Sequence, residues 1–157
     1  MTDSNTGPGA DDGDSGTVRD TYVAALQHDL FVPTENETLV GVVRRPTRWF
    51  SAAVDENVPA LGPPADLLDE TKTAEEDLKR SGICGEEAHN MAWEQTDFEV
   101  RYRQALSEIP ETRDAVDSVV SRLRRGENLV LVCYENTAKK RCHRTILADV
   151  LRDRLDD

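Results

Sequence analysis

Chemically capable side chains are concentrated in one twelve-residue segment near the carboxyl end of the chain. The segment begins with Cys133 and Glu135 and ends with Cys142, His143 and Arg144. A thiol can act as a nucleophile, an imidazole can carry a proton at neutral pH, and a carboxylate can orient either group. We therefore predict catalytic roles for Cys142 as nucleophile, His143 as acid–base group and Glu135 as orienting group.

Positive charge surrounds Cys142. Lys139, Lys140, Arg141 and Arg144 flank it, in a chain whose net charge is −12. We also expect Cys142 to lie in the first turn of the last helix, where the helix amino terminus favours anions and lowers the pKa of a thiol. The sequence therefore predicts that Cys142 is largely a thiolate at neutral pH. Cys142 and His143 are expected to be the most exposed groups of the segment.

Two apolar runs predict buried strands whose ends carry polar residues. Residues 38–43 form a β-branched run that leads into Arg44 and Arg45, and residues 128–133 form a second run that ends in Cys133. In open α/β sheets, ligands bind outside the carboxyl ends of the strands. We therefore predict a site for a small anionic or nucleotide-like ligand at these ends. The residues expected to bind it are Arg44, Arg45, Cys133 and Arg144.

Each of these residues also has a purely structural interpretation, and the sequence leaves it open. Cys133 ends an apolar strand, where a cysteine often serves as a small core residue. His143 has the alternative role of bonding a backbone carbonyl, and Arg144 that of pairing with a surface acid. The basic run 139–141 has the alternative of being a solvated loop.

Familiar cysteine motifs do not fit the segment. Phosphatase-type loops place an arginine closer to the cysteine than the seven residues that separate Cys133 from Arg141, and this loop has no glycine. A rhodanese-like loop is similar in outline, but it is shorter. Haem attachment requires Cys-x-x-Cys-His, and position 139 is a lysine. The segment therefore matches none of these three site types.

A metal-binding regulatory module is the first alternative function. Cys84 and His89 would join Cys133, Cys142 and His143 to supply enough ligands for zinc or iron. The chain has no Cys-x-x-Cys pair, so we assign no metal ligand. A non-enzymatic interaction protein is the second alternative. The sequence leaves open whether the chain is an enzyme, and it points to no particular cofactor or oligomeric state.

The charge balance of the chain is strongly acidic. There are 31 acidic and 19 basic residues among 157, and only four of the basic residues are lysines. An acidic, lysine-poor surface is typical of proteins that work in high salt, because salt screens its self-repulsion. We therefore expect a halophilic protein. Nucleic-acid binding is not expected, because it depends on neutralising phosphates with Lys and Arg.

Hydropathy and cysteine content predict the compartment. No apolar run approaches the ~20 residues that cross a bilayer, and no signal peptide is recognisable. We therefore expect no membrane partner and a cytoplasmic location. The three cysteines are an odd number, which in the cytoplasm indicates free thiols, metal ligands or redox groups rather than a disulfide framework.

The remaining pattern predicts one α/β domain over residues 17–157, preceded by a disordered acidic tail over residues 1–16. Its fold class is a small, mainly parallel sheet covered by helices, giving a helix-rich, three-layer domain. Thr112 is expected to cap the helix that follows Pro110. Besides a short helix near Trp49 and the last helix after Cys142, helices are expected at about 20–30, 65–81, 85–95, 97–109 and 112–125.

Three pieces of the chain resemble the domain of unknown function 488 family. They are a valine-rich strand running into Arg and Pro (39–46), a Phe-x-x-x-Tyr helix (98–106), and a strand, loop and helix with Cys-x-Glu and Cys-His-Arg (129–151). The resemblance spans roughly residues 16–155. It implies a small α/β domain without a settled activity, with its site at the residues already singled out.

The chain departs from that family at two places. The family often begins with its own strand ending in Gly-His-Ser or Gly-Tyr-Ser, whereas here Gly16 and Thr17 are expected to lead directly into a helix. The family also has an Asp before the Arg that follows the first strand, and this chain has Gly41 and Val42 in that region. Any role of that Asp therefore does not carry over.

Overall fold

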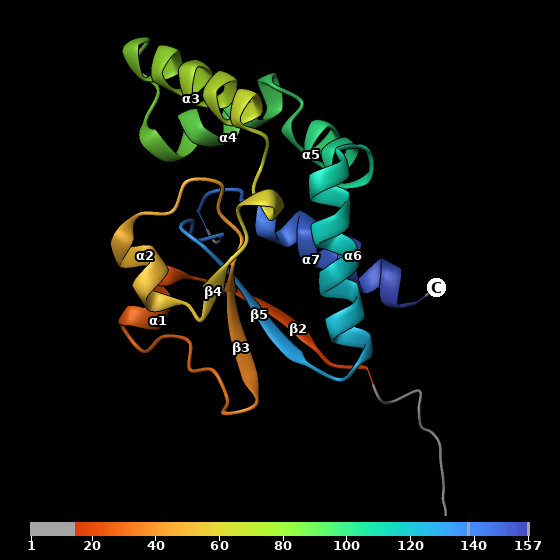
Figure 1. The fold of residues 1–157 in the computed structure, drawn as a ribbon. Helices are drawn as coiled ribbons and strands as arrows, with labels where there is room; N and C mark the ends of the chain where they lie inside the picture. Colours follow the sequence, from red (N-terminus) through yellow and green to blue (C-terminus); the bar gives the residue numbers. More distant parts are fainter. Residues whose placement is uncertain (1–14, 138, 157) are drawn as a thin grey trace, which may run out of the picture.

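The core of the protein is a parallel sheet of four strands, ordered β2-β5-β3-β4 (Figure 1). A computed structural model describes residues 15–137 and 139–156. The strands are β2 (Val18–Tyr22), β3 (Glu37–Gly41), β4 (Glu56–Asn57) and β5 (Asn128–Cys133). This sheet confirms the predicted class of a small parallel sheet covered by helices. The predicted tail, apart from residues 15 and 16, lies outside the described residues.

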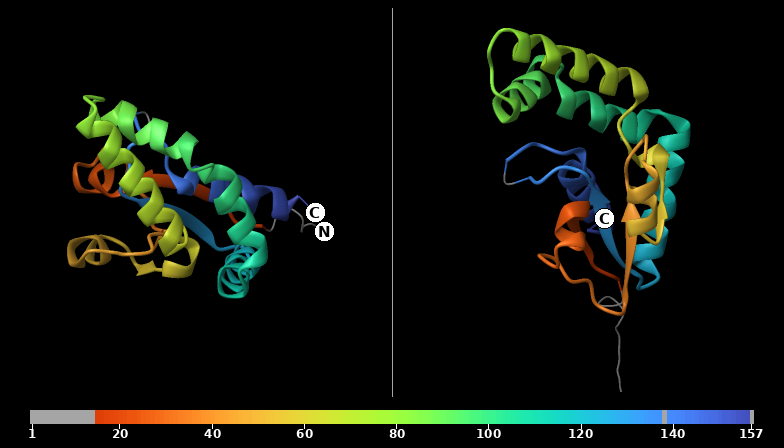
Figure 2. Two further views of the ribbon diagram at one scale, coloured as in Figure 1. Left: turned by 90° about the horizontal axis from the view of Figure 1, so that it is seen from above. Right: turned by 90° about the vertical axis from the view of Figure 1, so that its left-hand side faces the viewer.

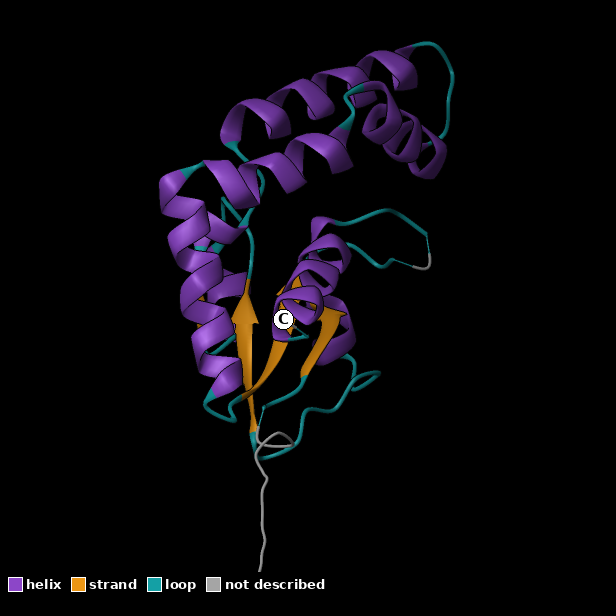
Figure 3. Cartoon of the chain, turned by 90° about the vertical axis from the view of Figure 1, so that its right-hand side faces the viewer, coloured by secondary structure: helices purple, strands orange, loops and turns teal. Residues whose placement is uncertain are grey.

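Helices supply the rest of the domain. The 3-10 helix η2 (Pro59–Leu61) precedes a group of three, α3–α5, which lies beyond the carboxyl edge of the sheet (Figures 1 and 3). None of the helices within residues 15–137 and 139–156 is long and apolar enough to cross a membrane. The α-helices are α1 (Val23–Gln27), α2 (Arg48–Ala53), α3 (Ala65–Arg80), α4 (Gly85–Gln95), α5 (Phe98–Glu108), α6 (Pro110–Arg124) and α7 (His143–Leu155).

Strand β5 is central, and its position explains its composition. It pairs with β2 on one side and β3 on the other, so that Val130 lies beside Arg19 and Leu39. Residues 129–133 are all buried. A parallel strand with neighbours on both sides and helices over the sheet has no polar environment for its side chains, so a continuous apolar run is favoured.

The parallel arrangement brings the ends of three strands together. Tyr22 at the end of β2 lies beside Cys133 at the end of β5, and Gly41 at the end of β3 lies beside Val132. Helix α7 then returns along β2, where the Arg152 guanidinium donates a hydrogen bond to the Val18 carbonyl at 2.7 Å. The segment that follows Cys133 and the start of α7 are therefore held at the carboxyl edge of the sheet.

The predicted helix at 20–30 is wrong. Residues 18–22 form strand β2, and only residues 23–27 are helical. The spacing of Tyr22, Leu26 and Leu30 indicated a longer helix, but Leu30 is 73% exposed and faces no core. Pairing with β5 over five residues overrides this weak local period. The chain therefore has the first strand that its sequence had not revealed, and the sheet has four strands instead of two.

The predicted cap of α6 is also wrong. The helix begins at Pro110, and Thr112 lies inside its first turn as a buried residue. Proline suits the first helical position, because its fixed φ matches the helix and its missing N–H would have no partner there. Helix α3 begins at Ala65, as predicted, and Pro64 is its N-cap residue.

Candidate functional site

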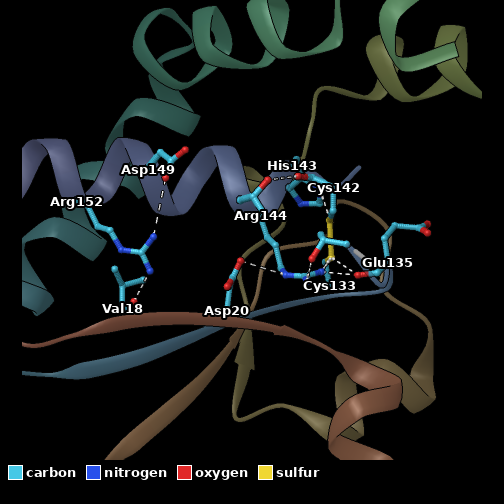
Figure 4. A network of polar contacts seen from close by, with 11 residues as sticks. Val18, Asp20, Cys133, Glu135, Cys142, His143, Arg144, Asp149 and Arg152 are labelled. Carbon is cyan, nitrogen blue, oxygen red and sulfur yellow. Dashed lines mark hydrogen bonds and ion pairs between the residues drawn. A yellow bond between two sulfur atoms is a disulfide. The ribbon is translucent and has the colours of Figure 1, made fainter. Parts of the chain in front are cut away.

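The sulfur atoms of Cys133 and Cys142 are joined in a disulfide (Figure 4). Cys133 is the last residue of β5, and Cys142 is the N-cap of α7. Their exposed fractions are only 1% and 3%, because both pack into the hydrophobic core. Two expectations are therefore corrected, since Cys142 is neither exposed nor a free thiol in this structure. Cys84 alone among the cysteines is a free, exposed thiol.

The guanidinium of Arg144 lies against the disulfide. Its Nη1 donates hydrogen bonds to Cys133 Sγ at 2.8 Å and to the Glu135 carbonyl at 2.5 Å, and its Nη2 donates to Thr137 Oγ1 at 3.1 Å. Its Nε forms an ion pair with Asp20 Oδ2 at 3.4 Å. Arg144 is 3% exposed. A buried cation is thus fixed beside one of the two sulfur atoms.

Asp20 is the site residue that sequence reasoning missed. It lies on β2, one strand away from Cys133, and its carboxylate faces Arg144 (Figure 4). The ring of Tyr22, at the end of the same strand, lies 6.0 Å from the Arg144 guanidinium. Both residues were assigned to a helix, where they would not reach this edge. Recognition of residues 18–22 as a strand would have placed them at the site.

The imidazole of His143 is fixed in one orientation by a backbone carbonyl. Its Nε2 lies 2.5 Å from the Val42 oxygen, and its Nδ1 lies 3.6 Å from Cys142 Sγ. A carbonyl oxygen can only accept, so Nε2 carries the hydrogen and Nδ1 is the acceptor that faces the sulfur. The ring also meets the edge of Tyr102, at 5.5 Å between ring centroids. His143 is buried rather than exposed, because the first turn of α7 packs into the core.

The orienting group of His143 is therefore the Val42 carbonyl, not the predicted Glu135. The carboxylate of Glu135 is directed away from His143, while its backbone carbonyl accepts from Arg144 (Figure 4). The alternative interpretation of His143, a bond to a carbonyl, is confirmed. The same bond nevertheless leaves Nδ1 facing Cys142, so this structural role and a chemical role do not exclude each other.

The arginines that follow β3 have other partners than the cysteines. The Arg44 guanidinium donates to the carbonyls of Gly62 and Pro63 at 3.2 and 3.1 Å. Arg45 forms an ion pair with Asp69 of α3 at 2.9 Å. These contacts connect the end of β3 to the start of α3. Arg144, by contrast, donates hydrogen bonds to Cys133 Sγ and to the Glu135 carbonyl.

Helix α4 holds the second half of the β5–α7 connection, the segment between Cys133 and His143. Asn90 donates to the Lys139 carbonyl at 3.1 Å and accepts from the Arg141 N–H at 3.1 Å. The Nε2 of His89 bonds the Arg141 carbonyl at 2.8 Å, and the Arg141 side chain pairs with Glu94. The basic run is thus anchored by its backbone rather than only solvated.

The family of the chain follows from its match to known families. Residues 23–155 match the family model described as "Active DUF488-N3 subclade". The chain belongs to the DUF488-N3 family. The matched range contains three of the four strands and the whole Cys133–Arg144 segment of this DUF488-N3 domain, while Asp20 on β2 precedes it. No curated protein and no solved structure matches the chain.

A metal centre has little geometric support in this DUF488-N3 domain. Within the described ranges, no group of three or more His, Cys, Asp and Glu residues is placed to hold a metal ion. His89 does approach the β5–α7 connection, but its Nε2 bonds a backbone carbonyl and its Nδ1 lies 3.5 Å from Glu75. Cys84 is exposed at the start of α4.

Burial of His143 predicts a pH dependence of stability. Burial lowers its pKa from 6.5 to about 4 in the folded domain. As pH falls below 6.5, the unfolded chain binds a proton that the folded domain does not, so stability falls through this window. The free energy of unfolding is lower by about 3 kcal/mol once the pH has fallen to the pKa of His143 in the folded domain. Above pH 6.5 this contribution is fully retained.

Urea unfolding between pH 7 and pH 4.5 measures this loss. The matched control is His28→Gln, which removes an exposed histidine and should keep the slope. His143→Gln should flatten it. Glu37, whose pKa is lowered to about 2 by its bond with Arg19, acts mainly below this window. Equal slopes in the wild type and His143→Gln would contradict the assignment.

Proposed function

We propose that this DUF488-N3 protein binds a small anionic molecule at the carboxyl edge of its sheet and acts on it through the thiol of Cys142. The observation that carries the proposal is the geometry of His143. Its Nε2 is committed to the Val42 carbonyl, which leaves Nδ1 as an acceptor 3.6 Å from Cys142 Sγ. A cysteine with a positioned imidazole acceptor is the arrangement that activates a thiol nucleophile.

The chemistry begins from the reduced protein. The Cys142 thiol transfers its proton to Nδ1 of the neutral His143, and the thiolate attacks an electron-poor atom of the ligand. The thiolate lies at the N-cap of α7, where the helix amino terminus favours negative charge. Because burial lowers the pKa of His143, the imidazole holds the proton only transiently and gives it readily to a leaving group, so the helix amino terminus must stabilise the thiolate during the step.

The charge of the ligand is inferred from the β5–α7 connection. Lys139 is exposed and Lys140 is half-buried there, in an otherwise acidic protein. Arg144 is committed to Asp20 and Cys133, so we assign it to stabilising the thiol pair instead of the ligand. Arg45 remains a ligand candidate, because its ion pair with Asp69 is exposed.

A nucleotide-like ligand is supported by an aromatic surface next to the connection. Trp49 of α2 is 50% exposed, and its ring lies 5.8 Å from that of Tyr134, the residue after Cys133. Tyr134 is held in place by the Thr47 N–H, which donates to its hydroxyl at 2.9 Å. Exposed rings of this kind stack on planar bases. The proposed ligand therefore carries both an anionic group and a flat ring.

Protection of Cys142 from alkylation tests the proposal. The reduced protein with Cys84→Ser is treated with iodoacetamide in the presence of phosphate, adenosine monophosphate or adenosine. We expect adenosine monophosphate to slow alkylation of Cys142 more than phosphate does, and adenosine to have little effect. Lys139→Gln with Lys140→Gln should weaken the protection, while Lys72→Gln with Lys79→Gln on α3 removes the same charge elsewhere and should not. Absence of protection by both anions would contradict the proposal.

A further inference from the structure

We infer that Cys133 and Cys142 form a reversible two-electron redox couple that exchanges with a low-molecular-weight thiol. The inference starts from the placement of the two sulfur atoms. Cys133 is fixed at the end of the central strand and Cys142 at the start of α7, with both side chains in the core. Reduction therefore leaves two thiols side by side, held by separate elements and ready to pair again.

The surroundings of the pair favour its reduced form. Arg144 Nη1 lies 2.8 Å from Cys133 Sγ, so a thiolate formed there gains a buried cation as its partner. Cys142 is the N-cap of α7, whose described first turn contains no acidic residue and whose cap has no side-chain hydrogen bond. A disulfide with only a structural role gains nothing from groups that stabilise thiolates. A couple whose reduced form is stabilised is instead readily reducible.

The exchange balances without any other reactant. The thiolate of one small thiol attacks a sulfur of the Cys133–Cys142 bond, which breaks and leaves the other sulfur as a thiolate. A second small thiol then attacks the mixed disulfide and releases the first sulfur. In total, two small thiols give up two electrons and their two protons and become one small disulfide, while the protein gains two thiols.

Helix α4 controls access to the pair. Both sulfur atoms are buried, and Glu135 and Thr137 of the β5–α7 connection contact Arg144 beside them. The second half of the connection is held by Asn90, through the Lys139 carbonyl and the Arg141 N–H. A thiol reaches the disulfide only when this connection moves. Asn90 therefore affects the rate of exchange, whereas Arg144 affects its equilibrium.

The couple would also regulate the proposed site, and this consequence rests on the proposed function. In the disulfide, Cys142 has no thiol to give a proton to His143, so the nucleophile is absent. Reduction restores it. The redox couple itself needs no ligand, so it stands or fails separately from the binding proposal.

The test is a redox titration of the full-length protein with Cys84→Ser in mixtures of reduced and oxidised glutathione, without any other ligand. The fraction of disulfide is read by mass after acid quenching and alkylation. We expect one reversible two-electron transition. Arg144→Met should favour the disulfide. The midpoint ratio of squared reduced glutathione concentration to oxidised glutathione concentration should therefore rise about ten-fold or more, and a ten-fold change corresponds to about one unit of thiol pKa.

Two further variants keep the test decisive if Arg144→Met does not fold. Asp20→Asn removes the carboxylate that partly neutralises Arg144, so it should shift the midpoint toward the dithiol. Asn90→Ala should have the wild-type midpoint, but its thiol–disulfide exchange with glutathione should be faster. A disulfide that resists glutathione until the protein is denatured, thiols that never pair, or an Asp20→Asn midpoint equal to that of the wild type would overturn the inference. Loss of anion protection with an intact redox transition would overturn only the proposed function.

Discussion

Replacing Arg144 with alanine is expected to lower the free energy of unfolding by about 3 kcal/mol. The guanidinium is buried and connects β2 to the β5–α7 connection through Asp20, Glu135 and Thr137. Its removal leaves the Asp20 carboxylate without its cation and the Glu135 carbonyl without that donor. The truncation also opens a cavity beside the disulfide, which adds to the loss.

Urea unfolding of oxidised protein measures this effect, because the disulfide then stays the same in both variants. Arg103→Ala is the matched control, since it removes a half-exposed arginine whose partner is Glu99 one helical turn away. Such a pair contributes about 0.5 kcal/mol or less. Equal losses of unfolding free energy for the two variants would show that the Arg144 contacts stabilise the fold no more than an exposed ion pair does. That result would contradict the stabilising role assigned to Arg144.

Replacing Tyr102 with alanine is expected to have the largest effect on stability, about 4 kcal/mol. The side chain is fully buried, its hydroxyl donates to the Leu61 carbonyl at 2.5 Å, and its ring meets the His143 imidazole. Burial also raises the pKa of Tyr102 well above its usual value, so it stays a neutral donor. Tyr102→Ala loses the packing of the ring, including its contact with the His143 imidazole.

Tyr102→Phe separates the hydroxyl from the ring. It keeps the packing but leaves the Leu61 carbonyl without this donor, so the expected loss is about 1–2 kcal/mol. The Tyr134 hydroxyl accepts from the Thr47 N–H at the surface, so Tyr134→Phe should lower the free energy of unfolding by less than Tyr102→Phe does. Urea unfolding of the three variants gives the order. A Tyr102→Ala loss no larger than that of Tyr102→Phe would contradict the packing role.

Most of the fold could be predicted because its elements have strong local signals. Residues 129–133 are apolar without interruption, and prolines precede or start α3 and α6. Strand β2 lacks such a signal, because Arg19 and Asp20 interrupt its apolar residues and only Val18 and Thr21 of its five residues are buried. Its identity depends on pairing with β5, which lies more than a hundred residues away along the chain.

The clustering of the residues between Cys133 and Arg144 could be predicted, but only part of their contacts could. The sequence placed Cys133, Cys142, His143 and Arg144 together, because they follow one strand and begin one helix. Local patterns carry no information on the side-chain directions that pair the two sulfur atoms or turn Glu135 away. The distant partners were missed because β2 and α4, red and green in Figure 2, lie far from the blue segment in sequence and contact it only in the folded chain.

The arginines after β3 illustrate the same limit. Arg44 and Arg45 occupy the predicted strand end, but each finds a partner within the next stretch of chain, in Gly62 and Asp69. A strand-end position is therefore not enough to place a side chain in a site. The decisive factor is which acceptors the following loop and helix bring within reach.

The pKa of the thiol pair tests the central claim most directly. The reduced protein with Cys84→Ser is titrated by its thiolate absorbance in the ultraviolet, which does not depend on reagent access. Cys133→Ser and Cys142→Ser assign the two thiols. We predict a first apparent pKa well below the ~8.5 of free cysteine, because Arg144 and the amino terminus of α7 stabilise the thiolate more than burial disfavours it. A first pKa at or above that value would contradict both the nucleophile and the redox couple.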